Sequence, residues 1–346
     1  MNYYIGLDVS MKETYFCVVD EKGNRMHEGK SPTEPDDIAI VLRDYLDKTE
    51  LIGLESGSLS HWLTEELLNL GYPVKCIDAR HCASFLSLRV NKTDRNDARG
   101  IAEVMRCGVY REVAVKSQKT RELSTILTSR KQLVNQRVQL ILSIRGILKP
   151  FGVRLGSIPK NKVGLEAVMA KISHLESGIQ LAVQSLVNAA IEIIINIKEL
   201  DTVVRNLAKS SPEAKLLMGI PGVGAITALK FLVEVGDKNR FRQSRAVGAY
   251  FGLTPKQYAS GETQKQGKIS KCGCKDMRSL LVEAAVVMLT RTRSWSKLKA
   301  WGIRLMKKTG LKKAATAVAR KLAVVMHSML KTGEEFMFSE RSLKVA

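Results

Sequence analysis

The first 110 residues alternate between short apolar segments and segments with helical spacing, and this alternation most limits the folds open to the chain. The order is strand, strand, strand, helix, strand, helix, strand, helix, which predicts an α/β unit. A turn at 21–24 makes the opening strands antiparallel, whereas crossovers make the later strands parallel. Strands are expected at 3–10, at 13–20, from Arg25, at 51–56 and at 73–78, and helices at 34–46, 61–70 and 93–105.

The middle of the chain, residues 111–210, has helical spacing with few glycines over 120–149 and 163–209. The Gly- and Pro-containing segment 152–161 divides these runs, which predicts a helical hairpin or coiled coil. Such a pair is either a core bundle or an element that mediates dimerisation or spaces two domains, and both remain open. No uninterrupted run of about 18 apolar residues exists, so we expect no membrane-spanning segment.

The last region, residues 211–346, is expected to be a mostly α-helical domain. Two helical segments joined by the glycine-rich stretch 219–224 have the pattern of a helix-hairpin-helix. In such a turn, backbone N–H groups and a helix N-terminus approach a DNA phosphate closely. Gly222 and Gly224 are therefore candidate nucleic-acid contacts, and the chain is predicted to have three domains: 1–110, 111–210 and 211–346.

Charge separates these regions. Residues 1–110 carry 13 basic and 18 acidic side chains, whereas residues 111–346 carry 42 basic and 16 acidic ones. A one-signed excess over a long globular stretch favours a polyanionic partner, because neutralised phosphates release counterions. Nucleic acid is the favoured partner over a merely solvated surface, and an anionic membrane is the weaker competitor.

Four carboxylates are candidates for a metal site: Asp8, Glu55, Asp94 and Asp97. Asp8 and Glu55 end apolar strands, where a carboxylate is costly unless it is paired or bound to a cation. Asp94 and Asp97 lie three apart and project from one helix face. Converging carboxylates bind Mg²⁺, which prefers hard oxygen ligands. Singly, Asp94 as an N-cap and Asp97 as its first-turn neighbour have an ordinary structural explanation.

A second candidate is Ser260, in what we expect to be a mobile loop at 258–263 followed by a lysine-rich stretch. Serine is a weak nucleophile without a base or positive charge nearby, and an ordinary Ser-Gly turn is the favoured interpretation from the residues alone. The lysines that could offset phosphate charge are Lys256, Lys265, Lys268 and Lys271. Scattered cysteines indicate reduced thiols in a cytoplasmic protein, and Cys272 and Cys274 lack a second Cys/His pair for zinc.

Taken together, the motifs resemble those of the DEDD-type insertion-sequence transposases of the one-ten family, the bridge-RNA-guided recombinases. The resemblance runs nearly end to end. It is carried by IGLDVS, GLESG, NKTDRNDA, GIPGVGAITA, FGLTPKQYASGETQKQGKISKCG with Arg278, and the LVEAA run.

The resemblance implies an RNase H-like, resolvase-type N-terminal domain whose four acids, Asp8, Glu55, Asp94 and Asp97, bind Mg²⁺. It also implies that Ser260 is the nucleophile, which attacks a DNA phosphodiester and forms a covalent phosphoserine link. This overturns the turn interpretation of Ser260. Lys271 and Arg278 are candidate phosphate contacts from charge and position.

The resemblance further implies partners: donor and target DNA, a noncoding bridge RNA that carries out sequence recognition, and a homodimer that assembles into a tetrameric synapse. It places the protein in a prokaryotic cytoplasm, associated with the nucleoid, with no membrane partner. Two other functions stay open. One is a metal-dependent nuclease or Holliday-junction resolvase that uses the acids and water, and the other is a non-catalytic nucleic-acid-binding protein.

Overall fold

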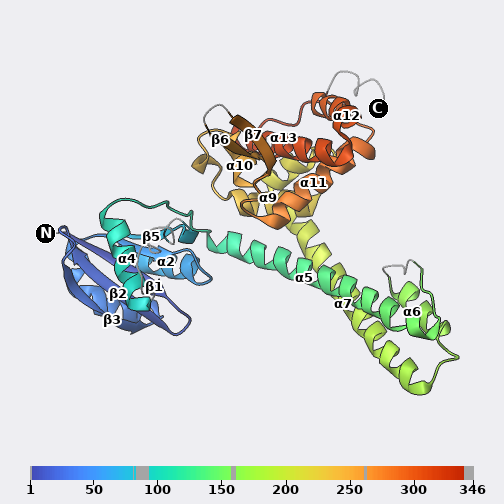
Figure 1. Cartoon of the computed structure of the whole chain (residues 1–346), viewed down its shortest axis with the longest axis horizontal. Helices are drawn as coiled ribbons and strands as arrows, with labels where there is room; N and C mark the ends of the chain where they lie inside the picture. Colours follow the sequence, from blue (N-terminus) through green and yellow to red (C-terminus); the bar gives the residue numbers. More distant parts are fainter. Residues whose placement is uncertain (1, 81, 83–92, 157–160, 261–262, 339–346) are drawn as a thin grey trace. The chain divides into compact units, whose positions relative to one another are not determined.

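The structure is a computed structural model that describes residues 2–80, 82, 93–156, 161–260 and 263–338. By its internal contacts the chain divides into two compact units, residues 1–117 and 118–346 (Figure 1). The segment 111–115 belongs to the first unit, because Asp78 and Val113 exchange backbone hydrogen bonds with Arg111 and Cys76 along one strand edge. The middle helices belong to the second unit together with the C-terminal helices.

A five-stranded sheet in the order β3-β2-β1-β4-β5 forms the centre of the first unit. The β1–β2 and β2–β3 pairs are antiparallel, whereas β1–β4 and β4–β5 are parallel. The prediction of an α/β unit with an opening antiparallel meander is therefore confirmed. The strands are β1 (Tyr3–Val9), β2 (Glu13–Asp20), β3 (Arg25–Pro32), β4 (Thr49–Glu55) and β5 (Val74–Ile77).

Helices cover both faces of this sheet. Ile5 and Leu7 point to one face, where they pack with Ile38, Leu63 and Leu67 of the helices α1 and α2. The alternate residues of β1 point to the other face, which α4 covers through Ala98 and Ala102 (Figure 1). The elements are α1 (Pro35–Leu42), a 3₁₀ turn η1 (Arg43–Lys48), α2 (Ser60–Asn69) and α4 (Asp94–Arg106).

The second unit begins with the expected helical hairpin, in which α5 packs along α7. At its far end Ile144, Leu148, Leu165, Val183 and Val187 form a separate small core. The elements are α5 (Gln118–Ile147), η2 (Lys149–Phe151), α6 (Lys162–Ala170) and α7 (Ser177–Ser210).

Helix α7 is the segment to compare with the expectation that nothing in the chain spans a membrane. It is long and apolar enough, by length and composition, to cross a membrane, with a mean hydropathy of 1.6 over its most apolar window. Only 22% of that window is buried within the chain, and Leu181 and Ile195 are among its exposed apolar residues. Gln, Asn, Ser and Glu residues interrupt the apolar run of this helix, so an uninterrupted stretch of about 18 apolar residues is absent, as expected, although the mean hydropathy of the window is high.

The rest of the second unit is a helical body around Phe231, Phe251, Leu281 and Leu322, all buried. The prediction of a mostly helical C-terminal region is confirmed. Its elements are α8 (Pro212–Met218), α9 (Ala225–Val235), η3 (Lys238–Arg240), α10 (Ala246–Tyr250), β6 (Pro255–Ser260), β7 (Thr263–Ile269), α11 (Lys275–Thr290), α12 (Lys297–Thr309) and α13 (Leu311–Thr332).

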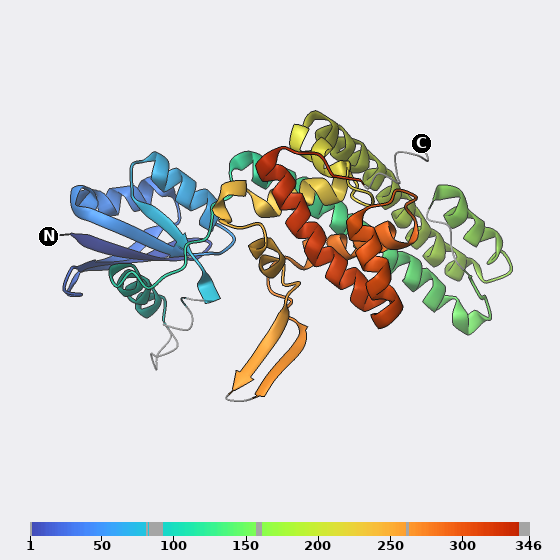
Figure 2. The ribbon, with the colours of Figure 1, turned by 90° about the horizontal axis from the view of Figure 1, so that it is seen from above.

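Strands β6 and β7 form an antiparallel hairpin, so the expectation of a mobile loop at 258–263 is wrong for its described residues. Figure 2 shows that this hairpin projects from the helices of its unit. Its strands lack an apolar face, which is why hydrophobic spacing gave no strand signal there.

Candidate active-site residues

Asp8 and Glu55 come at the carboxyl ends of two neighbouring parallel strands. Leu7 of β1 is paired with Leu54 of β4, so the next residue of each strand is one of these acids. Each acid lies two residues beyond a glycine, Gly6 or Gly53, that faces α4. Both carboxylates are therefore on the sheet face that α4 covers, at the same edge, and both are half-buried.

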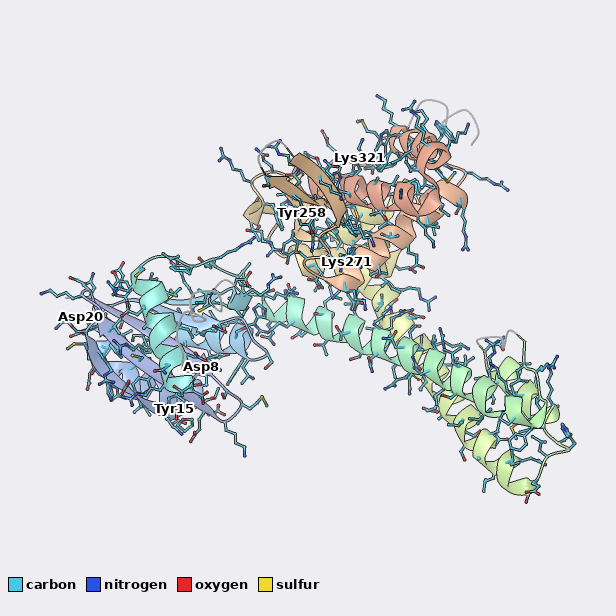
Figure 3. The ribbon with its side chains drawn as sticks, in the orientation of Figure 1. Asp8, Tyr15, Asp20, Tyr258, Lys271 and Lys321 are labelled. Carbon is cyan, nitrogen blue, oxygen red and sulfur yellow. The ribbon has the colours of Figure 1, made fainter. Side chains whose placement is uncertain are left out.

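Helix α4 brings its own acids to this edge. Its last residue, Arg106, donates from Nη1 to the carbonyl oxygen of Glu21, 3.2 Å away, near the start of β1. The helix therefore runs antiparallel to β1, and its first turn lies toward the strand's carboxyl end (Figure 3). That turn contains Asp94, which is exposed, and Asp97, which is half-buried.

The N-cap of α4 is Thr93, whose hydroxyl accepts a hydrogen bond from the backbone N–H of Asn96 at 3.2 Å. The alternative that Asp94 is the helix cap is therefore wrong. A carboxylate in the first turn still benefits from the helix dipole. Asn91 and Lys92, which precede the cap in the NKTDRNDA motif, lie outside the described residues.

The thiol of Cys82 is influenced by the negative charges of three of these acids. Its thiol is 1% exposed, and burial raises the pKa of Cys82, with a hydrogen bond to Glu55 adding to the rise. The negative charges of Glu55, Asp97 and Asp8 raise that pKa further. A lone cysteine in an apolar stretch carries no sequence signal of this environment, so sequence reasoning missed it.

The donor set fits a hard divalent cation, because carboxylate oxygens are the protein ligands that Mg²⁺ prefers. Within the described ranges, however, no three His, Cys, Asp or Glu side chains are already gathered at metal-binding spacing. Binding of a cation at this edge would therefore require the carboxylates to draw together, which the cation's charge favours.

Ser260 is the last residue of β6 and is paired with Thr263 of β7. It is exposed, as are Lys256, Lys265 and Lys268 on the same hairpin. The residues that follow the serine, Gly261 and Glu262, lie outside the described part of the chain. The hairpin therefore carries the candidate nucleophile and three of the candidate lysines on one projecting element (Figure 2).

Hydrogen bonds and close backbone packing fix the segment at the base of this hairpin. Lys271 is the one non-glycine residue in the described ranges with positive φ, at 58°. Arg278 of α11 donates from Nη1 to the carbonyl oxygens of Phe251, at 3.0 Å, and Cys272, at 2.8 Å. A β-carbon on Gly252 would overlap the backbone of Cys272. Arg278 therefore holds the segment that follows β7, in addition to any role toward a phosphate.

The glycine-rich turn between α8 and α9 has two different glycines. Gly222 has φ +92°, and a β-carbon there would lie 2.5 Å from the Ala284 carbonyl oxygen of α11, so this residue lets the turn pack on a helix. Gly224 is the exposed N-cap of α9, with open space around its β-carbon position. A cavity of about 840 Å³ beside the turn is lined by both glycines and by charged residues of both signs, the acidic ones being Asp201, Asp276 and Glu283 and the basic ones Arg130, Lys131, Arg137, Lys198, Arg205 and Lys230.

Two family models match the chain. A DEDD transposase model of the IS110 group matches residues 5–152, and a model described as the transposase IS116/IS110/IS902 family matches residues 214–300. The first covers β1, β4 and α4 with the four acids, and the second covers the glycine turn and the hairpin with Ser260.

Several curated proteins are similar. The transposase for insertion sequence element IS1111A of Coxiella burnetii is 27% identical over 343 residues, covering 96% of this chain and 90% of the relative. The transposase for insertion sequence element IS1328 of Yersinia enterocolitica is 27% identical, covering 83% and 85%. The pilin gene-inverting protein of Moraxella bovis is 30% identical over 149 residues, covering 41% and 45%. A solved structure of Thermus thermophilus RuvC covers 32% of this chain and 98% of its own, at 15% identity and a TM-score of 0.25.

Proposed function

The chain belongs to the IS116/IS110/IS902 family of insertion-sequence transposases, and from this premise we propose that it cuts and rejoins DNA through a covalent phosphoserine at Ser260, assisted by Mg²⁺ held by Asp8, Glu55, Asp94 and Asp97. Its N-terminal unit is, in this proposal, an RNase H-like nuclease domain of the resolvase type. The order of three antiparallel strands followed by two parallel ones, with acids at the ends of the central pair, supports this assignment.

The single observation that carries the proposal is the position of Asp8 and Glu55 next to each other at one sheet edge, with the first turn of α4 directed to the same edge. The negative charges of Glu55, Asp97 and Asp8 all raise the pKa of the buried Cys82 thiol, so negative charge is concentrated at this edge. A divalent cation would offset that charge. When bound, Mg²⁺ would stabilise charge on the phosphoryl oxygens and the leaving oxygen.

In the covalent step, Ser260 Oγ attacks the phosphorus of a DNA phosphodiester as it loses its proton. The new Oγ–P bond forms while the bond from phosphorus to the leaving strand oxygen breaks, and that oxygen takes up a proton as a free hydroxyl. The reverse attack, by a hydroxyl of another strand, restores the serine and joins the strands. The phosphoserine ester conserves the bond energy, so no nucleotide cofactor is required.

Positive charge supports this step. Lys256, Lys265, Lys268 and Lys271 lie on or next to the hairpin, where they would neutralise phosphate charge around Ser260. Gly224, at the N-cap of α9, would let backbone N–H groups reach a DNA phosphate beside the cavity, whose lining has six basic and three acidic residues. Gly222 would contribute by shaping that turn, and Arg278 by holding the segment that follows β7 while its remaining N–H groups face a phosphate.

The proposed partners are donor and target DNA, and a noncoding RNA of the same element that carries out sequence recognition. The net charge of +21 suits a protein that grips nucleic-acid backbones. We further propose a homodimer through exposed apolar residues of the α5–α7 hairpin, among which Leu142, Leu181 and Ile195 are 52%, 70% and 42% exposed. Two such dimers would form the synapse.

The name of one relative helps to choose between a protein that only cuts DNA and one that cuts and rejoins it. The pilin gene-inverting protein is named for gene inversion, a rearrangement that requires cut strands to be joined again. A metal-dependent nuclease remains the second candidate, because the acidic edge alone would suffice for hydrolysis by water.

The two candidates differ in their products. Purified protein, RNA from the flanks of the element, and labelled donor and target DNA are incubated with Mg²⁺ or with EDTA. The proposal expects joined donor–target strands in Mg²⁺, none in EDTA and none from Ser260→Ala, with Ser270→Ala at the end of the same hairpin as the matched control. Free ends that persist in Ser260→Ala would instead support the nuclease.

A further inference from the structure

The β6–β7 hairpin presents an aromatic ring on the same face as the candidate nucleophile. Tyr258 and Ser260 are two residues apart on β6, so their side chains leave the same face of the hairpin. Lys256 is on this face as well, and Lys265 of β7 is the register partner of Tyr258. One face therefore carries Lys256, Tyr258 and Ser260 along β6, with Lys265 beside Tyr258 on β7.

The ring of Tyr258 is held on one side and free on the other. A β-carbon on Gly267 would lie 3.0 Å from Tyr258 Cε2, so the ring lies diagonally across the hairpin onto the backbone of that glycine. The side chain is nevertheless well exposed, since the residue has 59% of its surface accessible. A ring that is fixed before binding loses little conformational freedom when it packs against a flat partner.

The chemistry around the ring indicates what this partner is. The described residues of the two strands contain Lys256, Lys265 and Lys268 and no acidic residue. A two-stranded hairpin exposed on both faces is marginally stable in water and gains from being covered. Lysines that flank an exposed aromatic ring match the phosphates and the planar bases of a nucleic acid, whereas a protein partner would have to supply an acidic surface.

We propose that Tyr258 stacks on an unpaired DNA base near the phosphate that Ser260 attacks, while Lys256 and Lys265 bind neighbouring phosphates. Two residues of an antiparallel strand span about 7 Å, and stacked DNA advances about 3.4 Å per base. The stacked base therefore belongs to a nucleotide about two steps from the scissile phosphate. This inference rests on the proposed nucleophile for its location, but the stacking contact is measurable without any cleavage.

The test measures binding of full-length Ser260→Ala protein to a short single-stranded DNA that carries 2-aminopurine. Stacking on Tyr258 is expected to change the probe's fluorescence. Tyr258→Ala and Tyr258→Leu are expected to lose that change and to weaken binding by about 5- to 140-fold. Leucine retains an apolar cover for Gly267 and lacks the aromatic face, so it separates stacking from hairpin folding. Tyr258→Phe should bind like the parent, and Gln257→Ala on the opposite face is the matched control.

Salt dependence separates the ring from the lysines. Tyr258→Ala should leave the slope of log affinity against log salt unchanged, whereas Lys265→Ala should lower its magnitude by about 0.7. Parent-like binding and fluorescence in Tyr258→Leu would overturn the inference. A larger loss on RNA of the same sequence than on DNA would contradict the assignment of the base to DNA. If Ser260 is not the nucleophile, covalent trapping fails while this binding result stands, so the two failures are distinguishable.

Discussion

Gly6 of β1 lies directly against Ala98 of α4: a β-carbon on Gly6 would overlap the carbonyl oxygen of Ala98. The contact is between two backbones, so neither side can give way through a side-chain rotation. Asp8 follows Gly6 by two residues on the same sheet face, and Asp97 directly precedes Ala98. The closeness of the helix to the strand at this point is therefore what brings the acids of both elements to one edge.

Gly6→Ala should consequently be more harmful than the same change at its register partner, Gly53. At Gly53 the added methyl group meets the side chain of Met105, which can move to another rotamer. We expect a loss of about 3 kcal/mol or more in the free energy of unfolding for Gly6→Ala, and about 1 kcal/mol for Gly53→Ala. Urea denaturation measures both. Equal losses would show that the helix does not depend on this contact.

The acidic edge should bind Mg²⁺ in the isolated protein. A ligand at about 100 times its dissociation constant stabilises the folded state by about 2.7 kcal/mol, which is visible as a rise in melting temperature. Glu55→Gln should abolish the rise caused by Mg²⁺, and in EDTA it should be about as stable as the parent, because the amide oxygen can still accept the hydrogen bond from the Cys82 thiol.

Asp47→Asn is the control for that measurement, because Asp47 is an exposed acid of η1. This variant should keep the full rise in melting temperature caused by Mg²⁺. A response that persists in Glu55→Gln would place the cation elsewhere.

Lys271 combines a left-handed backbone with a charge at the base of the hairpin, and two substitutions separate these properties. Both Lys271→Gly and Lys271→Ala remove the charge, so each should lower the magnitude of the salt slope of duplex DNA binding by about 0.9. Only glycine adopts φ near 58° without strain, so Lys271→Gly should be about 1 kcal/mol more stable than Lys271→Ala. Equal unfolding free energies, or an unchanged salt slope, would contradict this account.

The strands of the first unit were predictable because helices cover both faces of the sheet, and β1 and β2 therefore appear in the sequence as short, nearly continuous apolar runs. The β6–β7 hairpin escaped the same reasoning, since both of its faces are exposed. Its remaining signal was the two-residue Gly261-Glu262 connection, with glycine first, between Ser260 and Thr263.

The four acids of the candidate site could likewise be proposed from local sequence patterns. Strand ends identified Asp8 and Glu55, and helical spacing identified Asp94 and Asp97. A glycine-rich turn, in contrast, does not reveal whether it approaches a phosphate or a helix, and Gly222 packs on Ala284. The environment of Cys82 depends on tertiary contacts that no local pattern encodes.

His327 should make the second unit less stable in mild acid. Its Nε2–H donates to the carbonyl oxygen of Lys238, so Nδ1 accepts from the Ser244 hydroxyl and the ring is neutral. Burial lowers the pKa of His327 below its ordinary value of 6.5, and the charges of Lys331 and Arg240 lower it further.

The unfolded chain therefore binds a proton more readily than the folded one, and stability is lost as the pH falls below about 6.5. His327→Gln should flatten the dependence of the unfolding free energy on pH between 7 and 5, relative to the parent. His174→Gln, at an exposed position, should leave it unchanged. An unaltered pH dependence in His327→Gln would rule out this histidine as its source.

Covalent trapping on a denaturing gel tests the central claim most directly. Protein, Mg²⁺, labelled donor and target DNA and the RNA from the flanking element are incubated, denatured and resolved. We predict a protein–DNA adduct that is absent in Ser260→Ala and absent or weaker in Asp94→Ala. Cleavage without any adduct, abolished by Asp94→Ala but indifferent to Ser260→Ala, would contradict the serine mechanism and identify a metal-dependent nuclease.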